Sequence, residues 1–330
     1  MYKGKARAHT NIALIKYWGK ANKEIILPMN NSLSLTLDAF YTETTVTFSE
    51  ELTKDTFYLD AILQDEKGTK KVSQFLDLVR SLAKKDLFAT VESQNFVPTA
   101  AGLASSASGL AALAGACNAA LNLNLSEQDL SRLARRGSGS ACRSIYGGFV
   151  EWEKGQDDAT SFAKVIPSNQ WEDDLAMIFI LINDQQKDVS SRDGMERTVA
   201  TSVFYDGWLK TSPLDLQTAK EAIAEKDFEK LGVVTETNGL KMHGTTLGAT
   251  PPFTYWSADS LKAMNRVREI RQMGIPCYFT MDAGPNVKVL CQKKDAAEIL
   301  AQLETTFSKD QLTCAYSGPG LEYLETDVKA

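Results

Sequence analysis

The chain has 330 residues and a formal net charge of −6, with 43% hydrophobic and 24% charged residues. This length admits one large domain or two ordinary ones, and the acidic balance gives no basic footprint for nucleic acid. No stretch approaches the ~18 consecutive apolar residues of a membrane span, and the N-terminus lacks the apolar core of a signal peptide.

Cysteine and histidine usage limits the chemistry further. The five cysteines are odd in number and form no CxxC pair, which argues against a disulfide framework and a zinc site and favours a reducing compartment. The two histidines belong to no HExxH motif. We therefore expect a cytoplasmic enzyme with no membrane or nucleic-acid partner.

The sequence predicts mostly strands in the first third of the chain and both helices and strands after it. Strands are expected where β-formers cluster or alternate, at 44–48, 55–59, 88–93 and 147–152. Helices are expected where apolar residues recur at helical spacing, at 68–85, from the small-residue segment to Leu121, and at 126–136. Ser126 and Asp129 resemble a capping box at the start of the last of these.

The second half begins after the polar segment 170–174, where we place a domain boundary between 1–174 and 175–330. Strands are expected at 175–184, 277–282 and 287–291, and helices at 191–209, 215–225, 257–273 and 294–306. The mixed pattern predicts an α+β fold in both halves, each sheet being covered on one face by helices.

The segment PTAAGLASSASGLAAL (98–113) places glycines and serines at the start of a helix. A helix N-terminus exposes unpaired N–H groups and the positive end of the macrodipole, so small residues there allow a phosphate to approach closely. The segment matches neither the Walker A nor the Rossmann pattern. The alternative is that the small residues only let the helix pack tightly against its neighbour.

Four segments together resemble a known family. PTAAGLASSASGLAAL resembles the phosphate-binding motif of the GHMP kinase superfamily, and NIALIKYWGK (11–20), GSGSACRS (137–144) and FTMDAGPN (279–286) narrow the resemblance to the mevalonate diphosphate decarboxylases. The resemblance implies a two-domain GHMP-kinase-like fold: an N-terminal mixed sheet with helices, a C-terminal ferredoxin-like sandwich, and an active site in the cleft between them. It also implies ATP and Mg²⁺ as cofactors, mevalonate diphosphate as substrate, and a homodimer.

Asp282 follows an apolar strand and precedes a Gly-Pro turn. Such an Asp often stabilises its own turn, but the resemblance implies that it is the catalytic residue acting on the 3-hydroxyl group. Lys16 shares an apolar face with Ile12 and Leu14 if 12–17 is a strand, which either requires a partner or reflects a lysine stem reaching out to solvent. By the resemblance, Lys16 lies beside Asp282 and lowers the pKa of its carboxyl group.

Arg143 follows small residues, an arrangement suited to holding a carboxylate with a guanidinium fork, although a surface arginine at a helix start would look the same. The resemblance implies that Arg143 binds the substrate carboxylate and contributes to catalysis. Further substrate-binding residues implied by it are Asn11, Tyr17, Trp18, Gly19, Lys20, Lys71, Ser138, Gly139, Ser140, Ala141, Cys142 and Ser191.

The resemblance also implies a set of ATP-binding residues. These are Ser93, Asn95, Pro98, Ala101, Gly102, Leu103, Ala104, Ser105, Ser106, Ser108 and Lys187. Ser106 is expected to take part in catalysis and to hold the metal. Lys187 belongs to the charged segment 187–192, which reads either as a solvated loop or as a loop that closes over ATP.

Two other functions remain open. The chain could be a related kinase that stops after phosphorylating mevalonate or a mevalonate phosphate, or a nucleotide-binding interaction module without catalysis. Asp282, Arg143 and the KYWGK segment favour the full decarboxylation.

Overall fold

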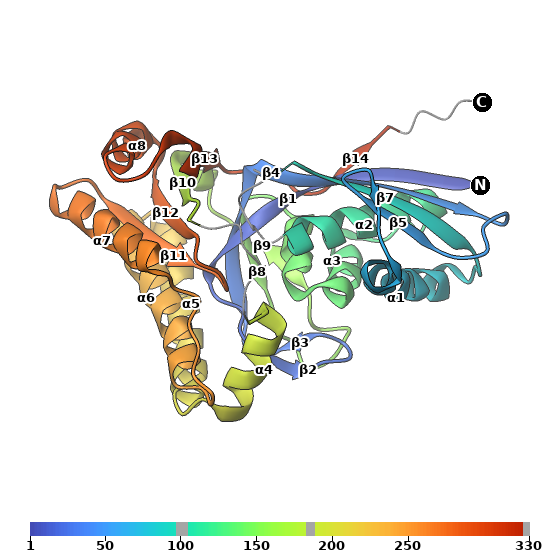
Figure 1. Cartoon of the computed structure of the whole chain (residues 1–330), viewed down its shortest axis with the longest axis horizontal. Coiled ribbons are helices and arrows are strands. Elements are labelled where there is room, and N and C mark those ends of the chain that lie inside the picture. Colours follow the sequence, from blue (N-terminus) through green and yellow to red (C-terminus); the bar gives the residue numbers. More distant parts are fainter. Residues whose placement is uncertain (97–104, 183–188, 326–330) are drawn as a thin grey trace.

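The fold is described from a computed structural model, which covers residues 1–96, 105–182 and 189–325. The first layer is a mixed sheet in the order β14-β1-β4-β7-β5-β6, in which β8 also pairs with β4 and β9 (Figure 1). Its strands are β1 (Tyr2–Ile15), β4 (Ser32–Ser49), β5 (Thr56–Leu59), β6 (Ile62–Leu63), β7 (Phe88–Phe96), β8 (Phe149–Trp152), β9 (Ala163–Val165) and β14 (Glu322–Leu324). Only β5 and β7 pair in parallel among these described strands. A separate hairpin consists of β2 (Lys20–Asn22) and β3 (Leu27–Pro28).

Three helices cover one face of this sheet: α1 (Glu66–Ala83), α2 (Ser105–Leu121) and α3 (Glu127–Gly137). Helix α2 lies unusually close to β1. A Cβ atom on Gly4 would be 2.3 Å from the Ala116 carbonyl oxygen, and one on Gly115 would be 3.0 Å from the Ala6 methyl group. The small residues of α2 that follow the segment 98–113 therefore serve tight packing against β1. Within the segment, a Cβ atom on Gly109 would meet nothing within 4 Å, so the packing alternative stays open there.

The second sheet is antiparallel in the order β11-β12-β10-β13. Its strands are β10 (Leu175–Ile180), β11 (Cys277–Met281), β12 (Val287–Gln292) and β13 (Leu312–Tyr316), and with the intervening helices they give the β-α-β-β-α-β order of a ferredoxin-like sandwich. Helices α7 (Ala258–Gln272) and α8 (Ala296–Glu304) cover one face. The predicted α+β fold is confirmed.

The expectation of one covered face is wrong for this second sheet. Its other face shares a core with β1, β4 and helices α5 (Tyr205–Glu225) and α6 (Phe228–Leu247). All six residues of β10 are buried, as expected for a strand covered on both sides. The boundary at 174/175 stays a prediction, and the end of the described chain returns to the first sheet, where β14 pairs with β1.

The helices between β10 and β11 differ from those predicted. The helix expected at 191–209 ends as α4 (Ser191–Thr201), and α5 begins at Tyr205 and continues through Pro213, where the sequence predicted a break. Helix α6 was missed because it contains three glycines and several threonines, all weak helix formers. Its Gly232 faces the Tyr278 ring so closely that a Cβ atom would be 1.9 Å from it, so tertiary packing outweighs propensity.

The remaining short elements are 3₁₀ turns. They are η1 (Gly139–Ile145), η2 (Trp171–Asp174), η3 (Lys293–Asp295) and η4 (Lys309–Gln311). The Ser126 hydroxyl accepts the Asp129 N–H at the start of α3, as the capping pattern predicted. In the described part of the chain, no helix combines the length and apolar character needed to cross a membrane.

Candidate active site

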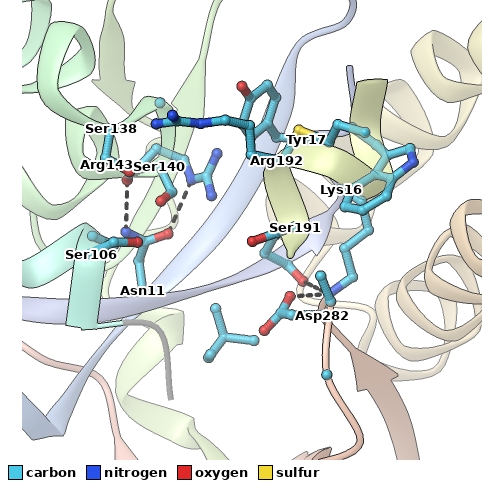
Figure 2. A pocket seen from close by; sticks show the side chains of 18 of the residues that line it. Asn11, Lys16, Tyr17, Ser106, Ser138, Ser140, Arg143, Ser191, Arg192 and Asp282 are labelled. Atoms are coloured by element: carbon cyan, nitrogen blue, oxygen red, sulfur yellow. Dashed lines mark hydrogen bonds and ion pairs between the residues drawn. The ribbon is translucent and has the colours of Figure 1, made fainter. Parts of the chain in front are cut away.

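A cavity of about 370 Å³ lies where the two halves of the chain meet. It contains residues from β1 and η1 of the first half and from the β11–β12 turn of the second. Thirteen of the predicted site residues line it: Asn11, Lys16, Tyr17, Trp18, Lys20, Lys71, Ser106, Ser138, Gly139, Ser140, Arg143, Ser191 and Asp282. The sequence therefore predicted residues that are far apart along the chain and close together in space (Figure 2).

Asp282 stands between two buried lysines. Lys16 Nζ is 2.8 Å from Asp282 Oδ1, and Lys288 Nζ is 3.2 Å from Asp282 Oδ2. The lysine side chains are 3% and 4% exposed, whereas the Asp282 side chain is 37% exposed and faces the cavity. Each carboxylate oxygen thus has its own ammonium partner, and the carboxylate remains accessible to a ligand.

These contacts set the charge of the carboxylate. Burial by itself would raise the pKa of Asp282, but attraction to Lys16 and Lys288 outweighs burial and holds this pKa well below its usual range. Burial lowers the pKa of Lys16, and the Asp282 charge opposes that change. Asp282 is therefore an ionised acceptor at neutral pH.

Lys16 is fixed from behind by its backbone. Strand β1 ends at Ile15, so Lys16 lies just beyond the strand, whereas a strand at 12–17 would have included it. The side chain of Lys16 points inward from this loop. Its N–H donates to Asn238 Oδ1 on α6 at 2.8 Å, and Nδ2 of Asn238 donates to Asp215 on α5 at 2.9 Å. The Lys16 ammonium also donates to the Ala13 carbonyl oxygen at 2.8 Å. The solvent-reaching alternative for Lys16 is wrong.

Arg143 lies at the opposite wall and is also buried. Its Nε donates to Asn11 Oδ1 at 3.1 Å and to Ser34 Oγ at 3.0 Å, and its Nη1 donates to Ser32 Oγ at 2.6 Å. Burial lowers the pKa of Arg143, yet a guanidinium stays protonated at neutral pH. The surface-arginine alternative is therefore wrong: neutral oxygens hold a charged guanidinium that can accept an anionic partner.

A second group of cations lies at another part of the cavity. Lys20, Lys71 and Arg192 all line it. Burial lowers the pKa of Lys20 and of Lys71, and repulsion from Arg192 lowers both further. Three cations that repel one another in a partly buried space have the charge to suit a multiply charged anion.

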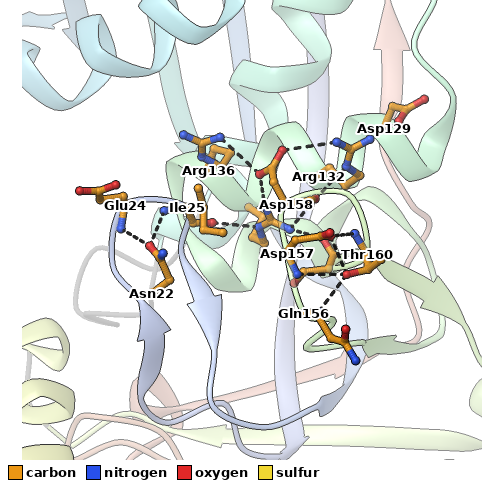
Figure 3. A network of polar contacts seen from close by, with 12 residues as sticks. Asn22, Glu24, Ile25, Asp129, Arg132, Arg136, Gln156, Asp157, Asp158 and Thr160 are labelled. Carbon is orange, nitrogen blue, oxygen red and sulfur yellow. Dashed lines mark hydrogen bonds and ion pairs between the residues drawn. The ribbon is translucent and has the colours of Figure 1, made fainter.

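A polar network anchors the β2–β3 hairpin that carries Lys20 (Figure 3). Arg132, Arg135 and Arg136 of α3 all pair with Asp158. The fully buried Arg135 also donates from Nε to the Ile25 carbonyl oxygen at 3.2 Å. The hairpin is thus tied to the same helix that leads into η1.

Some predicted residues lie outside the cavity. Ser108 and Asn95 both bond the Thr42 hydroxyl, at 2.8 and 2.9 Å, and Ser93 bonds Thr44 at 2.8 Å. The other described residues that were predicted for the site but do not line the cavity are Gly19, Ala141 and Cys142. Pro98, Ala101, Gly102, Leu103, Ala104 and Lys187 lie outside the described residues, as does the side chain of Ser105. The ligand contacts of all these residues stay predictions.

Two of these residues have a clear structural role. Gly19 has φ +103°, and a Cβ atom there would be 2.0 Å from the Tyr205 hydroxyl, so only glycine fits this turn. Cys142 is fully buried in a small core with Val150 and Trp152, and burial raises the pKa of its thiol to about 12. Its side chain packs in this core and does not line the cavity.

Sequence reasoning missed Lys288 and Arg192 as site residues. Lys288 is the only charged residue in the strand VKVLCQ, and the argument applied to Lys16, that a lysine on an apolar face requires a partner, would have identified it. Arg192 was noted only as part of a charged segment. Helix α4 begins at Ser191, and its first two residues, Ser191 and Arg192, line the cavity.

Family models match nearly the whole chain. The diphosphomevalonate decarboxylase-like N-terminal domain matches residues 8–163, and the mevalonate 5-diphosphate decarboxylase C-terminal domain matches residues 177–328. The chain belongs to the diphosphomevalonate decarboxylase family. The family enzyme of Candida albicans is 36% identical over 323 residues, which cover 93% of this chain and 89% of that protein.

Solved structures of the family have the same fold. Mevalonate diphosphate decarboxylase from Enterococcus faecalis is 68% identical with a TM-score of 0.95, covering 98% of this chain and 99% of that chain. The Staphylococcus aureus enzyme is 57% identical with a TM-score of 0.96, covering 98% of both chains. Another structure, 69% identical with a TM-score of 0.96 and coverage of 98% and 99%, is a complex with MVAPP, AMPPCP and magnesium.

Proposed function

We propose that this chain catalyses the ATP-dependent decarboxylation of (R)-mevalonate 5-diphosphate to isopentenyl diphosphate, ADP, phosphate and CO₂, a step of the mevalonate pathway of isoprenoid biosynthesis. The observation that supports this most directly is one cavity that holds an ionised Asp282, a buried Arg143 and a separate group of cations. A hydroxyl, a carboxylate and a diphosphate are the three groups that the substrate presents. Family membership supports the same assignment.

Asp282 is assigned to the 3-hydroxyl group. Because its pKa is held low by the two lysines, the carboxylate is a weak base and a permanent acceptor. It therefore orients the hydroxyl oxygen for attack on the γ-phosphate and accepts the proton as the hydroxyl becomes acidic during transfer. Lys16 fixes the carboxylate in this orientation.

Arg143 is assigned to the substrate carboxylate. Once the 3-hydroxyl carries phosphate, departure of that phosphate develops positive charge at the tertiary carbon, and the electrons released with CO₂ quench it. The C–C bond and the leaving C–O bond must then be aligned, which requires a carboxylate held in one orientation. The three oxygens that bond Arg143 fix its guanidinium for this task.

The cation group is assigned to the substrate diphosphate. Lys20, Lys71 and Arg192 supply charge, and Tyr17, Ser138, Ser140 and Ser191 supply hydroxyl groups to the same cavity. Binding a diphosphate there relieves the repulsion that lowers the lysine pKa values.

ATP is assigned to the N-terminal end of α2, where Ser106 lines the cavity. Among the described residues no group of three or more His, Cys, Asp or Glu side chains could hold a metal ion, and both Asp282 oxygens already have lysine partners. A hydroxyl ligand such as Ser106, together with phosphate oxygens, fits Mg²⁺, which needs few protein ligands. When bound, Mg²⁺ neutralises charge on the phosphates.

The proposal includes a cytoplasmic homodimer. All five cysteines are free and four of them are buried, which is consistent with a reducing compartment. Sedimentation equilibrium of the purified chain measures the dimer directly, and a monomer at micromolar concentration would remove that part of the proposal.

A single-turnover reaction tests the function. Protein in excess is mixed with Mg²⁺, ATP and carboxyl-labelled mevalonate diphosphate, and both ADP and labelled CO₂ are quantified. Equal amounts of the two products are expected. ADP without CO₂ would mean a kinase that stops after phosphorylation, and neither product would mean a binding module.

A further inference from the structure

Lys288 is a charged residue in an interior strand of the second sheet. It lies opposite Phe179 of β10 and Thr280 of β11, so the backbone around it is fixed on both sides. Its neighbours Val287 and Val289 pack into the core with α7 and α8. Because side chains alternate along a strand, Lys288 faces the other side, toward α6 and the cavity.

The fold alone does not explain a lysine at this position. Leu290, two residues further along β12 and on the same face, is fully buried in an apolar core. Lys288 is 3% exposed, and an ammonium is far more costly to bury than an apolar side chain unless it is paired. The partners of its Nζ among the described residues are the Asn286 carbonyl oxygen at 3.3 Å and Asp282 Oδ2 at 3.2 Å.

We propose that Lys288 is a positioning residue for the reaction. Lys16 and Lys288 each hold one oxygen of the Asp282 carboxylate, and together they fix its plane and keep it ionised. This inference rests on the proposed function of Asp282. One ammonium would leave the carboxylate free to rotate about that contact. Two ammonium groups on different oxygens, from β12 and from the loop after β1, fix the plane. The remaining lone pairs then face the cavity, where the hydroxyl must lie.

The other charged and titratable groups near Asp282 do not replace Lys288. Arg143, from η1, interacts with Asp282 electrostatically but bonds Asn11, Ser32 and Ser34 instead. His243, from α6, is neutral at pH 7, because burial, followed by repulsion from Lys16, lowers its pKa to about 3. Without Lys288, Lys16 is therefore the one remaining cation in direct contact with Asp282 among the described residues.

Three variants test the proposal. Lys288→Met removes the charge and keeps an unbranched side chain, Lys288→Arg keeps the charge, and Lys294→Met is a control at an exposed lysine just after β12. We expect Lys288→Met to lower kcat about 10- to 100-fold, the scale of a misplaced reacting group, with KM for both substrates within about threefold of the parent. Lys288→Arg should recover most of the loss, and Lys294→Met should match the parent.

The pH profile separates positioning from a purely structural role. In the parent, Asp282 stays ionised through the acid range, so kcat shows no acid limb from this group. In Lys288→Met the carboxyl protonates at a higher pH, and an acid limb should appear that Lys288→Arg does not show. Unchanged kcat and profile would overturn the proposal. A raised KM with unchanged kcat would also overturn it, since Lys288 would then bind substrate directly.

A readout that needs no turnover keeps this inference distinct from the proposed function. The ¹³C shift of the Asp282 carboxyl carbon is followed by NMR against pH in protein labelled at Asp, with Asp282→Asn providing the assignment. Its titration should move to higher pH in Lys288→Met, in samples whose thermal unfolding shows a folded protein. An unmoved titration would refute the inference even in an active enzyme. A moved titration in a protein that releases no CO₂ would instead refute the proposed function alone.

Discussion

Replacing Asp282 with asparagine tests the charge balance at the centre of the site. Asp282→Asn keeps the size of the side chain but leaves the ammonium groups of Lys16 and Lys288 without an anionic partner. Removing one partner of a fully buried pair costs about 3–5 kcal/mol. Because the Asp282 side chain is 37% exposed, solvent screening should reduce the loss of unfolding free energy to about 2 kcal/mol, or roughly 3–6 °C in melting temperature.

The loss of stability should depend on pH with a definite sign. Burial lowers the pKa of Lys16, and in the variant the carboxylate that opposed this is gone, so the pKa falls further below its ordinary 10.5. At a pH between the pKa of Lys16 in the folded variant and its pKa in the unfolded chain, the folded state binds fewer protons than the unfolded state. The unfolding free energy of the variant therefore rises with pH in this range. The deficit relative to the parent should therefore shrink as pH rises and be smallest above pH 10.5.

Urea unfolding at pH 7 and near pH 10.5 measures this difference, with exposed Asp86→Asn as the matched control. In the same variant, kcat should fall about 10²- to 10⁴-fold, the range of proton-transfer and orientation effects, while substrate binding by calorimetry stays within a few fold. Parent-like stability at pH 7, or a deficit that does not change with pH, would refute the electrostatic reasoning. Parent-like turnover would remove Asp282 from the chemistry.

Three further changes test other parts of the site and fold. Arg143→Lys should lower kcat/KM at least about tenfold in steady-state assays, because an ammonium cannot reproduce the planar fork; an unchanged value would remove Arg143 from substrate binding. Lys20→Met should raise KM for mevalonate diphosphate with kcat nearly unchanged, and a fall in kcat alone would contradict its diphosphate role. Gly4→Ala should cost about 1–3 kcal/mol in urea unfolding, since its Cβ atom would be 2.3 Å from a backbone oxygen of α2; parent-like stability would contradict the tight packing of α2 on β1.

Elements with a strong apolar period were predictable, and elements determined by packing were not. Helix α1 was expected at 68–85 and runs from Glu66 to Ala83, because Val72, Phe75, Leu76 and Val79 form one buried face. Helix α6 has no comparable pattern, since it is buried on several sides and two of its glycines, Gly232 and Gly239, fit against β11. A local sequence window contains the apolar spacing that predicts α1, but it does not contain the contacts with distant strands that stabilise α6.

The residues of the candidate site were predicted from motifs, but the contacts that hold them in place could not be predicted from the sequence. The Lys16–Asp282 pair joins residues 266 apart in the chain, a contact that local spacing cannot predict and that the family resemblance supplied. Asn238 lies in the missed helix, so its bond to the Lys16 backbone was also missed. Lys288 carried a readable signal, a lone charge in an apolar strand, but only the structure shows which carboxylate it meets.

The distribution of charge in the cavity opposes that of the whole chain. The net charge is −6, yet among the described residues the charged side chains lining the cavity are six cations and one carboxylate: Lys16, Lys20, Lys71, Arg143, Arg192, Lys288 and Asp282. Burial and repulsion from neighbouring cations lower the pKa values of Lys20 and Lys71, and burial lowers the pKa of Arg143, so the ligand-free site holds these charges at a cost in free energy. An anionic ligand releases that free energy, whereas a neutral analogue of the same shape does not. We therefore expect the site to favour anionic over neutral ligands of the same shape. The Asp282 carboxylate is stable in this positive field because Lys16 and Lys288 each pair with one of its oxygens.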